Sequence, residues 1–341
     1  MAAVDDIRSS IVLRVVVNLL EKGDVQGAVA AMNLDHDAFA KFELAIVNAY
    51  NGGGQAFVAN LPKMSDPSGN RVVWHFGVRN TPGEAELRRH SAAFVTAATE
   101  DIKQAIGESM AEGLAKGQNP TQTALQVIGK VNRVTGKREG GILGLTSQQS
   151  DYVDNPRYRL NPDVEPPGAR QQLESGDPAM MKAYLKRGRR DKRFDKTILK
   201  AIKDGKPLPK EFIDRVVGRY SDGLLKLRGE AVGLNETMNA LAKSRHDAMQ
   251  QQIDAGKAES QDVTKVWHHP AEEHPRLQHI AMDGKSVGFE EQFQMPDGTL
   301  MRYPHDPDAP AKHTIFCRCR TEYRFNAIDA LIRKRRLAGV Q

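Results

Sequence analysis

The chain has 341 residues, of which 40% are hydrophobic and only 6% aromatic, and its formal net charge is +6. A chain of this length can form two or three domains with cores of their own, and its alanine- and leucine-rich composition favours helices over a large β-sandwich. No apolar run approaches the roughly 20 residues that span a bilayer, and the N-terminus lacks the layout of a signal peptide, so we expect a soluble protein without a membrane role.

Helical patterns dominate the first part of the chain. Apolar spacing predicts helices over residues 7–20, 24–32 and 36–50. The triplet Gly52-Gly53-Gly54 is expected to end the third helix as a flexible connector, because it lacks the lysine and the preceding strand of a phosphate-binding loop. Residues 71–78 alternate weakly and could form a short strand.

Three start signals mark the helices that follow. Thr81-Pro82-Gly83-Glu84 has the form of a capping box with proline at the first helical position, and it predicts a helix over residues 81–115. Asn119 is placed to cap the next helix, and Thr146 with Gln149 forms a second capping box.

A segment rich in proline and glycine, residues 155–180, is the best internal boundary. The sequence therefore predicts a helical N-terminal domain over 1–154, a linker over 155–180, a C-terminal domain over 181–325 and a basic tail over 326–341.

The C-terminal domain is expected to change character along its length. A long helix is predicted over residues 222–255, and the chain then becomes rich in turns. The turn Pro296-Asp297-Gly298 lies between two short runs, 285–289 and 299–303, which is a hairpin signal. We therefore predict a mostly α protein, with multi-helix N-terminal and central regions and a small α+β C-terminal module that contains a short β-hairpin.

A series of unlike motifs follows in order along this last stretch. They are a tryptophan, an acidic residue, Arg-x-x-His, Asp-Gly, an aromatic residue, a Pro-Asp-Gly turn and Cys-x-Cys: Trp267, Glu272, Arg276-Leu277-Gln278-His279, Asp283-Gly284, Phe293, Pro296-Asp297-Gly298 and Cys317-Arg318-Cys319. The series resembles the phage Mu protein F-like head morphogenesis family, the minor head proteins of tailed phages. Phe316 stands where that family usually has asparagine.

The resemblance implies a minor head (capsid) protein that acts in procapsid assembly and in DNA packaging or ejection. It implies the portal protein and other head proteins as partners, a place inside the phage head in the virion, and the host cytoplasm during assembly. It further implies no enzymatic activity and no catalytic residue. The motif residues would then form a structural knob: Trp267, Glu272, Arg276, His279, Asp283, Gly284, Cys317 and Cys319. We expect Trp267 to be buried, with both cysteines near His279.

The cysteines and histidines of the knob raise the question of a metal. Cys317, Cys319, His279 and a further histidine (His268, His269, His274 or His313) could supply four zinc ligands. The spacing C-x-C is less usual for zinc than C-x-x-C, and a disulfide between such close neighbours would be strained. We favour two small buried cysteines that hold the last strand beneath Trp267, and predict no metal and no cofactor.

Catalysis is the alternative function. His279 with Glu272 and Glu236 could suggest acid–base chemistry, but no nucleophile or phosphate-binding motif accompanies them, and a buried polar network is favoured, with Arg276 paired to a carboxylate. A metal-dependent hydrolase or nuclease using His279, Cys317 and Cys319 remains the competing interpretation.

Two basic clusters could contact DNA without regard to its sequence. Their candidate residues are Lys186, Arg187, Arg189, Arg190, Lys192 and Arg193 in the first cluster, and Arg333, Lys334, Arg335 and Arg336 in the second. A solvated charged surface is the competing interpretation, and the scarcity of aromatic residues argues against base stacking.

Overall fold

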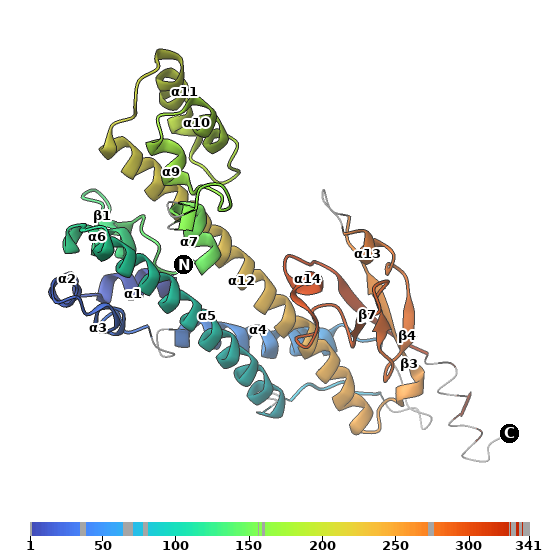
Figure 1. Cartoon of the computed structure of the whole chain (residues 1–341). Coiled ribbons are helices and arrows are strands. Elements are labelled where there is room, and N and C mark those ends of the chain that lie inside the picture. Colours follow the sequence, from blue (N-terminus) through green and yellow to red (C-terminus); the bar gives the residue numbers. More distant parts are fainter. Residues whose placement is uncertain are drawn as a thin grey trace. The chain divides into compact units, whose positions relative to one another are not determined.

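The computed structural model describes residues 2–34, 39–63, 71–77, 81–155, 157–158, 161–271 and 276–326, and the single residues 328, 332, 333 and 336. The fold is mostly α, as predicted (Figure 1). It divides into two compact units: the first comprises Met1–Lys41 and Ala92–Glu230, and the second comprises Phe42–Ser91 and Ala231–Gln341. Among the described residues, no helix is both long and apolar enough to cross a bilayer.

These units differ from the predicted division at residues 155–180. Each unit combines two separate segments, because the long helices α4 (Ala40–Ala59), α5 (Thr81–Ala115) and α12 (Lys210–Asp254) each have residues in both. The predicted linker also contains a packed helix, α9 (Ala169–Glu174), in which Ala169 and Leu173 are buried. Most of the predicted basic tail lies outside the described residues.

In the described part of the first unit, the regular elements are helices and one two-stranded ribbon. Besides its parts of α5 and α12 it contains α1 (Ala2–Ser10), α2 (Leu13–Glu21), α3 (Val25–Ala30), α6 (Pro120–Ile128), β1 (Lys130–Val131), β2 (Arg138–Glu139), α7 (Ser147–Val153), α9, α10 (Pro178–Leu185), the 3-10 helix η2 (Lys192–Phe194) and α11 (Asp195–Asp204). One core unites α2, α5, α6 and α12 through Leu20, Ile106, Val127 and Val216.

The predicted helix starts in this unit hold. Asn119 accepts a hydrogen bond from the Thr121 amide, and Thr146 with Gln149 forms a complete capping box. The helix predicted over 7–20 is instead broken before Val12, whose extended backbone starts α2 anew. The break follows from burial, because it allows apolar residues of both α1 and α2 to reach the same core.

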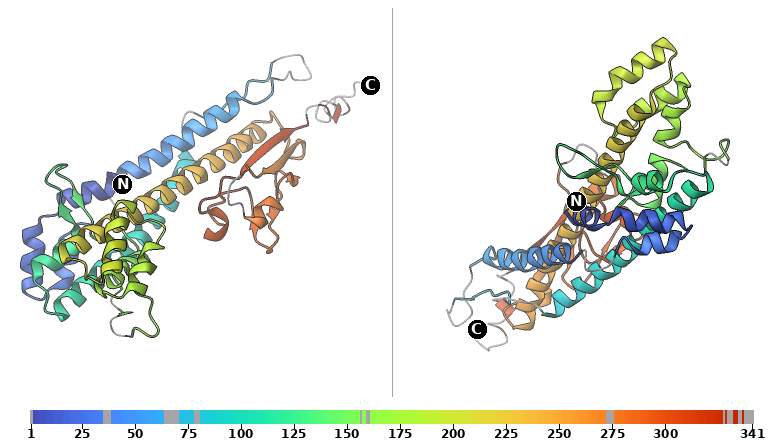
Figure 2. Two further views of the ribbon diagram at one scale, coloured as in Figure 1. Left: turned by 90° about the horizontal axis from the view of Figure 1, so that it is seen from above. Right: turned by 90° about the vertical axis from the view of Figure 1, so that its left-hand side faces the viewer.

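In the second unit, α4 runs alongside the last turns of α12 (Figure 2). The glycine triplet lies inside α4 and does not end it, so that prediction was wrong. The reason is close packing: a Cβ atom on Gly53 would lie 2.6 Å from Ser244 Oγ, and one on Gly54 would lie 2.4 Å from the Phe76 ring. The strand predicted over 71–78 is also absent from the described residues 71–77, where the His75 backbone bonds the Gln252 side chain instead.

The triplet offers a matched test of this packing. We expect Gly54→Ala to lower the free energy of unfolding by roughly 1–3 kcal/mol, because the added methyl group collides with the Phe76 ring. Gly52→Ala should raise it by up to about 1 kcal/mol, because that position is exposed and alanine favours helix. Urea unfolding of both variants checks this, and equal effects would contradict the packing argument.

The rest of the second unit is a small α+β module, residues 260–325. Its elements are the 3-10 helix η3 (Ser260–Asp262), β3 (Val263–His268), α13 (Leu277–Ile280), β4 (Ser286–Gly288), β5 (Phe293–Gln294), β6 (Leu300–Met301), α14 (Ala311–Thr314) and β7 (Arg320–Phe325). Strand β3 is the centre of an antiparallel sheet of order β4-β3-β7, in which Trp267 lies opposite Thr321.

The predicted hairpin exists, with one different strand. Strands β5 and β6 pair across the turn at Pro296-Asp297-Gly298, where Gly298 has a φ of 86°. The run 285–289, which precedes the turn in the sequence, contains β4 and pairs with β3 instead. Local turn chemistry predicted the bend correctly, but the larger sheet decided which strand took part.

Candidate functional site

Trp267 is the centre of the C-terminal module. It lies in β3 with 0% of its surface exposed, and its ring meets Phe293 edge to face at 5.3 Å and His279 at 6.0 Å between centroids. Its small core also includes Met282, Met301 and both cysteines. The prediction that Trp267 is buried, with Cys317 and Cys319 near His279, is confirmed.

The Asp-Gly pair holds α13 against the end of β3. Gly284 adopts a φ of 76° and donates its amide to the Trp267 carbonyl at 2.9 Å, while Asp283 accepts a hydrogen bond from the His269 amide at 2.8 Å. Only glycine adopts such a backbone conformation without strain, so this motif has a clear structural role.

Two other knob residues have predicted roles that the described residues do not test. Arg276 donates to the Ile315 carbonyl, and its predicted carboxylate partner is not among the residues that the structure describes. Its bond therefore links the start of α13 to the loop that leads to the cysteines. Glu272 lies outside the described residues, so its predicted place in the knob stays a prediction.

One buried cluster brings together an imidazole and two sulfurs. Nδ1 of His279 lies 3.5 Å from Cys317 Sγ and 3.5 Å from Cys319 Sγ, and all three side chains are at most 3% exposed. The Cys319 amide donates to Cys317 Sγ at 3.3 Å, and His269 Nδ1 lies 3.3 Å from Cys319 Sγ. Neither cysteine forms a disulfide.

The environment favours a thiolate at Cys317. A hydrogen bond from Cys319 lowers the pKa of the Cys317 thiol most; burial opposes it, and His279 and His305 lower it further. The resulting pKa lies far below the usual value of 9.0. Thiolates are the form of cysteine that binds metals, and also the form that reacts with electrophiles.

A second set of side chains orients His279 from behind. Its Nε2 lies 3.4 Å from Nδ1 of His313, whose Nε2 lies 2.9 Å from a carboxylate oxygen of Asp297. A hydrogen bond from Lys312 lowers the pKa of Asp297 most, and the Thr299 amide and His313 contribute as well, so this carboxylate is ionised. An ionised carboxylate only accepts hydrogen bonds, which fixes the direction of the chain Asp297–His313–His279.

Two further imidazoles border the cluster. Nε2 of His269 is buried and has no hydrogen-bond partner among the described residues, whereas His305 is 0% exposed and interacts with Cys317. An unsatisfied buried polar atom is costly, so each such nitrogen requires an explanation.

The sequence motifs indicate only part of this arrangement. They single out His279, Cys317 and Cys319, with His269 and His313 as alternatives. Asp297 belongs to them only as a turn residue, and His305 belongs to none of them. No spacing rule could have found these two, because the β5–β6 hairpin and the following loop bring them to the cluster.

Of the other two histidines considered, His268 faces Glu322 across the β3–β7 pair, away from the sulfurs. His274 lies outside the described residues. Neither therefore enters the described cluster.

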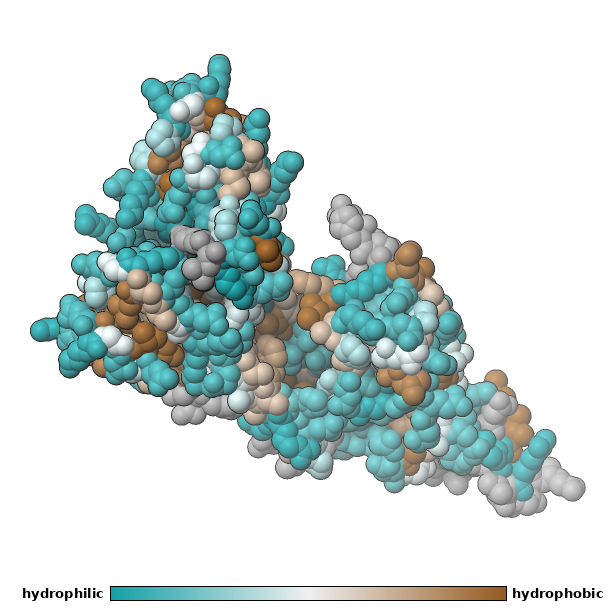
Figure 3. Space-filling view, viewed as in Figure 1, coloured by the Kyte–Doolittle hydropathy of each residue, from teal (hydrophilic) through white to brown (hydrophobic). Residues whose placement is uncertain are grey.

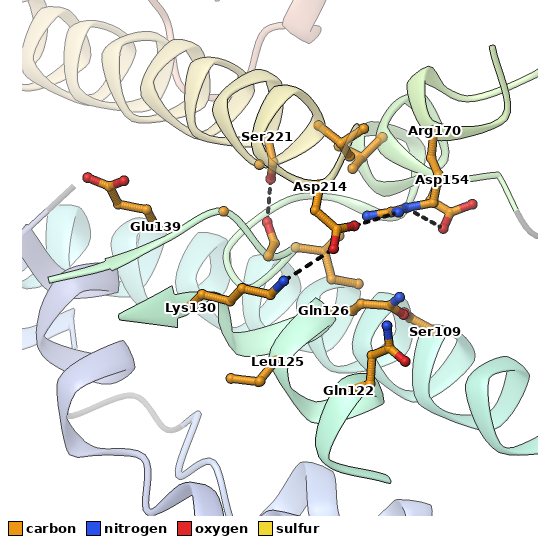
Figure 4. Close-up of a pocket in the computed structure, with 16 residues that line it drawn as sticks. Ser109, Gln122, Leu125, Gln126, Lys130, Glu139, Asp154, Arg170, Asp214 and Ser221 are labelled. Atoms are coloured by element: carbon orange, nitrogen blue, oxygen red, sulfur yellow. Dashed lines mark hydrogen bonds and ion pairs between the residues drawn. The ribbon is translucent and has the colours of Figure 1, made fainter. Parts of the chain in front are cut away.

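A polar pocket in the first unit is a weaker candidate (Figure 4). Asp214 of α12 accepts hydrogen bonds from Lys130 at 3.2 Å and Arg170 at 2.9 Å, and Arg170 also pairs with Asp154 at 3.4 Å. The cavity measures about 90 Å³, whereas ligand pockets usually measure about 300–1,000 Å³. Its charged groups neutralise one another, which is typical of a structural ion-pair network.

Half of the first basic cluster is engaged in internal contacts. Arg187 donates to Gln172, to the Tyr152 and Pro167 carbonyls and to the Tyr220 hydroxyl; Arg190 pairs with Asp195, and Arg193 with Asp191. Lys186, Arg189 and Lys192 are exposed. In the second cluster Arg333 pairs with Asp262 and Glu259 and Arg336 is exposed, whereas Lys334 and Arg335 lie outside the described residues.

Comparisons with known proteins add little to this geometry. The uncharacterized protein YqbB of Bacillus subtilis (strain 168) is 26% identical to this chain over 95 residues. The match covers 27% of this chain and 29% of YqbB, so the two proteins share similarity over less than a third of either. No family model matches the chain, and no solved structure matches it.

Proposed function

We propose that this protein is a minor head protein of a tailed phage, located inside the head and associated with the portal, that acts in procapsid assembly and in DNA packaging or ejection. One observation supports this most directly. The motif residues that carry the family resemblance are spread over some fifty positions, yet Trp267, His279, Cys317 and Cys319 meet in one core. The resemblance therefore rests on a coherent structural unit.

A structural role suits this unit better than catalysis. His279, Cys317 and Cys319 are buried, and a hydrolase or nuclease must admit both its substrate and a water molecule to its catalytic group. We therefore propose no catalytic residue and no enzymatic activity, and do not favour the metal-dependent hydrolase.

Purified particles test the main proposal. Procapsids and mature heads from the source phage or prophage should contain this chain in few copies, measured by mass spectrometry against the major capsid protein. Pull-down of the portal protein should recover it, and deletion of its coding sequence should reduce the yield of filled heads. Its absence from purified particles would contradict the proposal.

We also propose that the protein contacts DNA without regard to its sequence. The basic surface available for this contact extends beyond the first basic cluster. The segment 178–210 contains twelve lysines and arginines and three aspartates, a formal charge of +9 against +6 for the whole chain. It forms α10, η2 and α11, which lie together in the first unit (Figure 1), and its surface is mostly hydrophilic (Figure 3). We call this segment the basic lobe.

Four exposed basic side chains of the basic lobe suit phosphate contact better than its paired arginines. Lys186, Arg189, Lys192 and Lys196 are exposed, whereas moving Arg187 would break four hydrogen bonds. The neighbouring groove that Arg193 lines also contains Glu211, Asp214 and Asp222, so it does not attract anions strongly.

We expect weak duplex binding that is indifferent to sequence and falls steeply with salt. Replacing Lys186, Arg189, Lys192 and Lys196 by serine should flatten the log–log salt slope by roughly 3–4 units, because each phosphate contact adds about 0.9. The effect should be equal on unrelated duplexes, since phosphate contacts carry no base information. Salt titration by fluorescence anisotropy measures it.

The matched control removes four exposed lysines outside the lobe: Lys22, Lys41, Lys63 and Lys226. It has the same net charge as the lobe variant and should retain most of the slope. Equal loss in both variants would show a diffuse charge effect, and wild-type protein that does not bind at low salt would refute the DNA contact.

A further inference from the structure

The cluster around His279 has the composition and spacing of a metal centre. We propose that His279 Nδ1, Cys317 Sγ and Cys319 Sγ bind one zinc ion, with His269 Nδ1 as the fourth ligand, and that this ion holds the C-terminal module together. The inference concerns the isolated chain and does not depend on the proposed role in phage heads. It departs from our sequence-based prediction of no metal.

The distances agree with tetrahedral zinc. Bonds of about 2.3 Å to sulfur and 2.0–2.1 Å to nitrogen, at tetrahedral angles, place ligand sulfur and nitrogen about 3.6 Å apart. The observed separations are 3.5 Å from His279 to each sulfur and 3.3 Å from His269 to Cys319. The ligand atoms of His279, Cys317 and Cys319 all lie within 4.8 Å of one another. His269 lies outside this set of three, so its ring must shift toward the other ligand atoms to complete the tetrahedron.

The direction of the hydrogen bonds behind His279 gives a second, independent argument. Asp297 accepts a hydrogen bond from the Nε2–H group of His313, which leaves His313 Nδ1 to accept a hydrogen bond from the Nε2–H group of His279. A neutral His279 then presents a lone pair, at Nδ1, to both sulfurs. A ligating histidine usually donates its other N–H group to a hydrogen-bond acceptor that fixes its orientation; here His313 is that acceptor, and Asp297 holds His313 in turn.

The local charge also fits an ion in this position. Two thiolates balance the charge of one zinc ion, so the filled site would be neutral, as its burial requires. A thiol that is still protonated releases its proton to solvent as the ion binds. Arg318 and Arg320 alternate with the cysteines and are exposed, so their charges lie outside the buried cluster.

A structural ion would stabilise the C-terminal module, whose apolar core alone contributes little. Its central apolar core is small, and small modules commonly need a metal or a disulfide to be stable. The four ligands come from the end of β3, from α13 and from the loop before β7. One ion would join all three segments where strand pairing ends, at His268 opposite Arg320.

The test is the metal content of full-length protein purified without a polyhistidine tag. We expect about one zinc per chain, and a lower melting temperature after treatment with a strong chelator that added zinc restores. Cys317→Ser, Cys319→Ser and His279→Ala should each lose the zinc. His75→Ala is the control and should keep it, because His75 is exposed and only its backbone bonds Gln252.

Two further measurements test the zinc site without the ligand variants, which could fail to fold. Wild-type protein reconstituted with cobalt should show thiolate-to-cobalt charge transfer and the intense visible bands of tetrahedral coordination. Asp297→Asn keeps an acceptor for the Thr299 amide but removes the charge behind His313, and should weaken zinc binding about 10–100-fold in chelator competition.

Three outcomes would overturn parts or all of the proposal. Wild-type protein without any transition metal, and with a melting temperature indifferent to added zinc, would leave a thiol–imidazole network in its place. Stoichiometric iron or copper would refute zinc. Release of zinc by His305→Ala but not by His269→Ala would refute the fourth ligand, since His305 also borders Cys317.

Discussion

Replacing Trp267 with alanine is expected to lower the free energy of unfolding of the second unit by about 3–5 kcal/mol, the usual cost of removing a large buried aromatic side chain. The side chain is 0% exposed and touches Phe293 and His279 edge to face. A cavity at this position would remove contacts from both β5 and α13. We therefore expect the variant to unfold at a clearly lower urea concentration.

The second tryptophan makes the measurement specific. Trp74 belongs to the same unit, so its fluorescence still reports unfolding after Trp267 is replaced. Trp74→Ala is the matched control: this ring is only half-buried, contacts Phe325 and bonds the Pro62 carbonyl, and its loss should cost no more than about 2 kcal/mol. Equal losses in the two variants would show that Trp267 is not the centre of the module.

Lys265 is expected to make stability rise with pH. It lies in β3 with 1% of its surface exposed, and Nζ donates to the carbonyls of Glu291 at 2.6 Å and Arg302 at 2.9 Å. Burial lowers its pKa to about 8 from 10.5, only partly opposed by Glu290 and Asp306. The folded state thus releases this proton near pH 8, while the unfolded state keeps it until about pH 10.5.

Because the unfolded state binds more protons in that window, deprotonation favours folding. Between pH 7 and 9.5 the free energy of unfolding should rise by up to about 2 kcal/mol more in the wild type than in Lys265→Met. Urea unfolding at several pH values measures the difference. Lys285→Met replaces an exposed lysine of the same module and should follow the wild type. Identical pH slopes for the wild type and Lys265→Met would refute the shift.

Several corrections have one cause, which is packing between residues far apart in the sequence. Gly52-Gly53-Gly54 signals a connector locally, but α4 needs glycine there because α12 and Phe76 approach so closely. Residues 285–289 precede a hairpin turn in the sequence, and the turn alone predicts that they form one strand of that hairpin. They pair with β3 instead, which pairs with β7 on its other edge. Arg187 belongs to a basic run, but its guanidinium group donates hydrogen bonds to two backbone carbonyls and to the Tyr220 hydroxyl.

The sequence by itself determined the helical class, the capped helix starts at Asn119 and Thr146, the Pro296-Asp297-Gly298 turn and the burial of Trp267. These depend on local backbone chemistry and on hydrophobicity, which neighbouring residues largely set. Only the tertiary structure decided how the segments combine into two units and which side chains surround His279. A relay such as Asp297–His313–His279 has no period or spacing, because its members come from separate elements that meet only when the sheet and hairpin have formed.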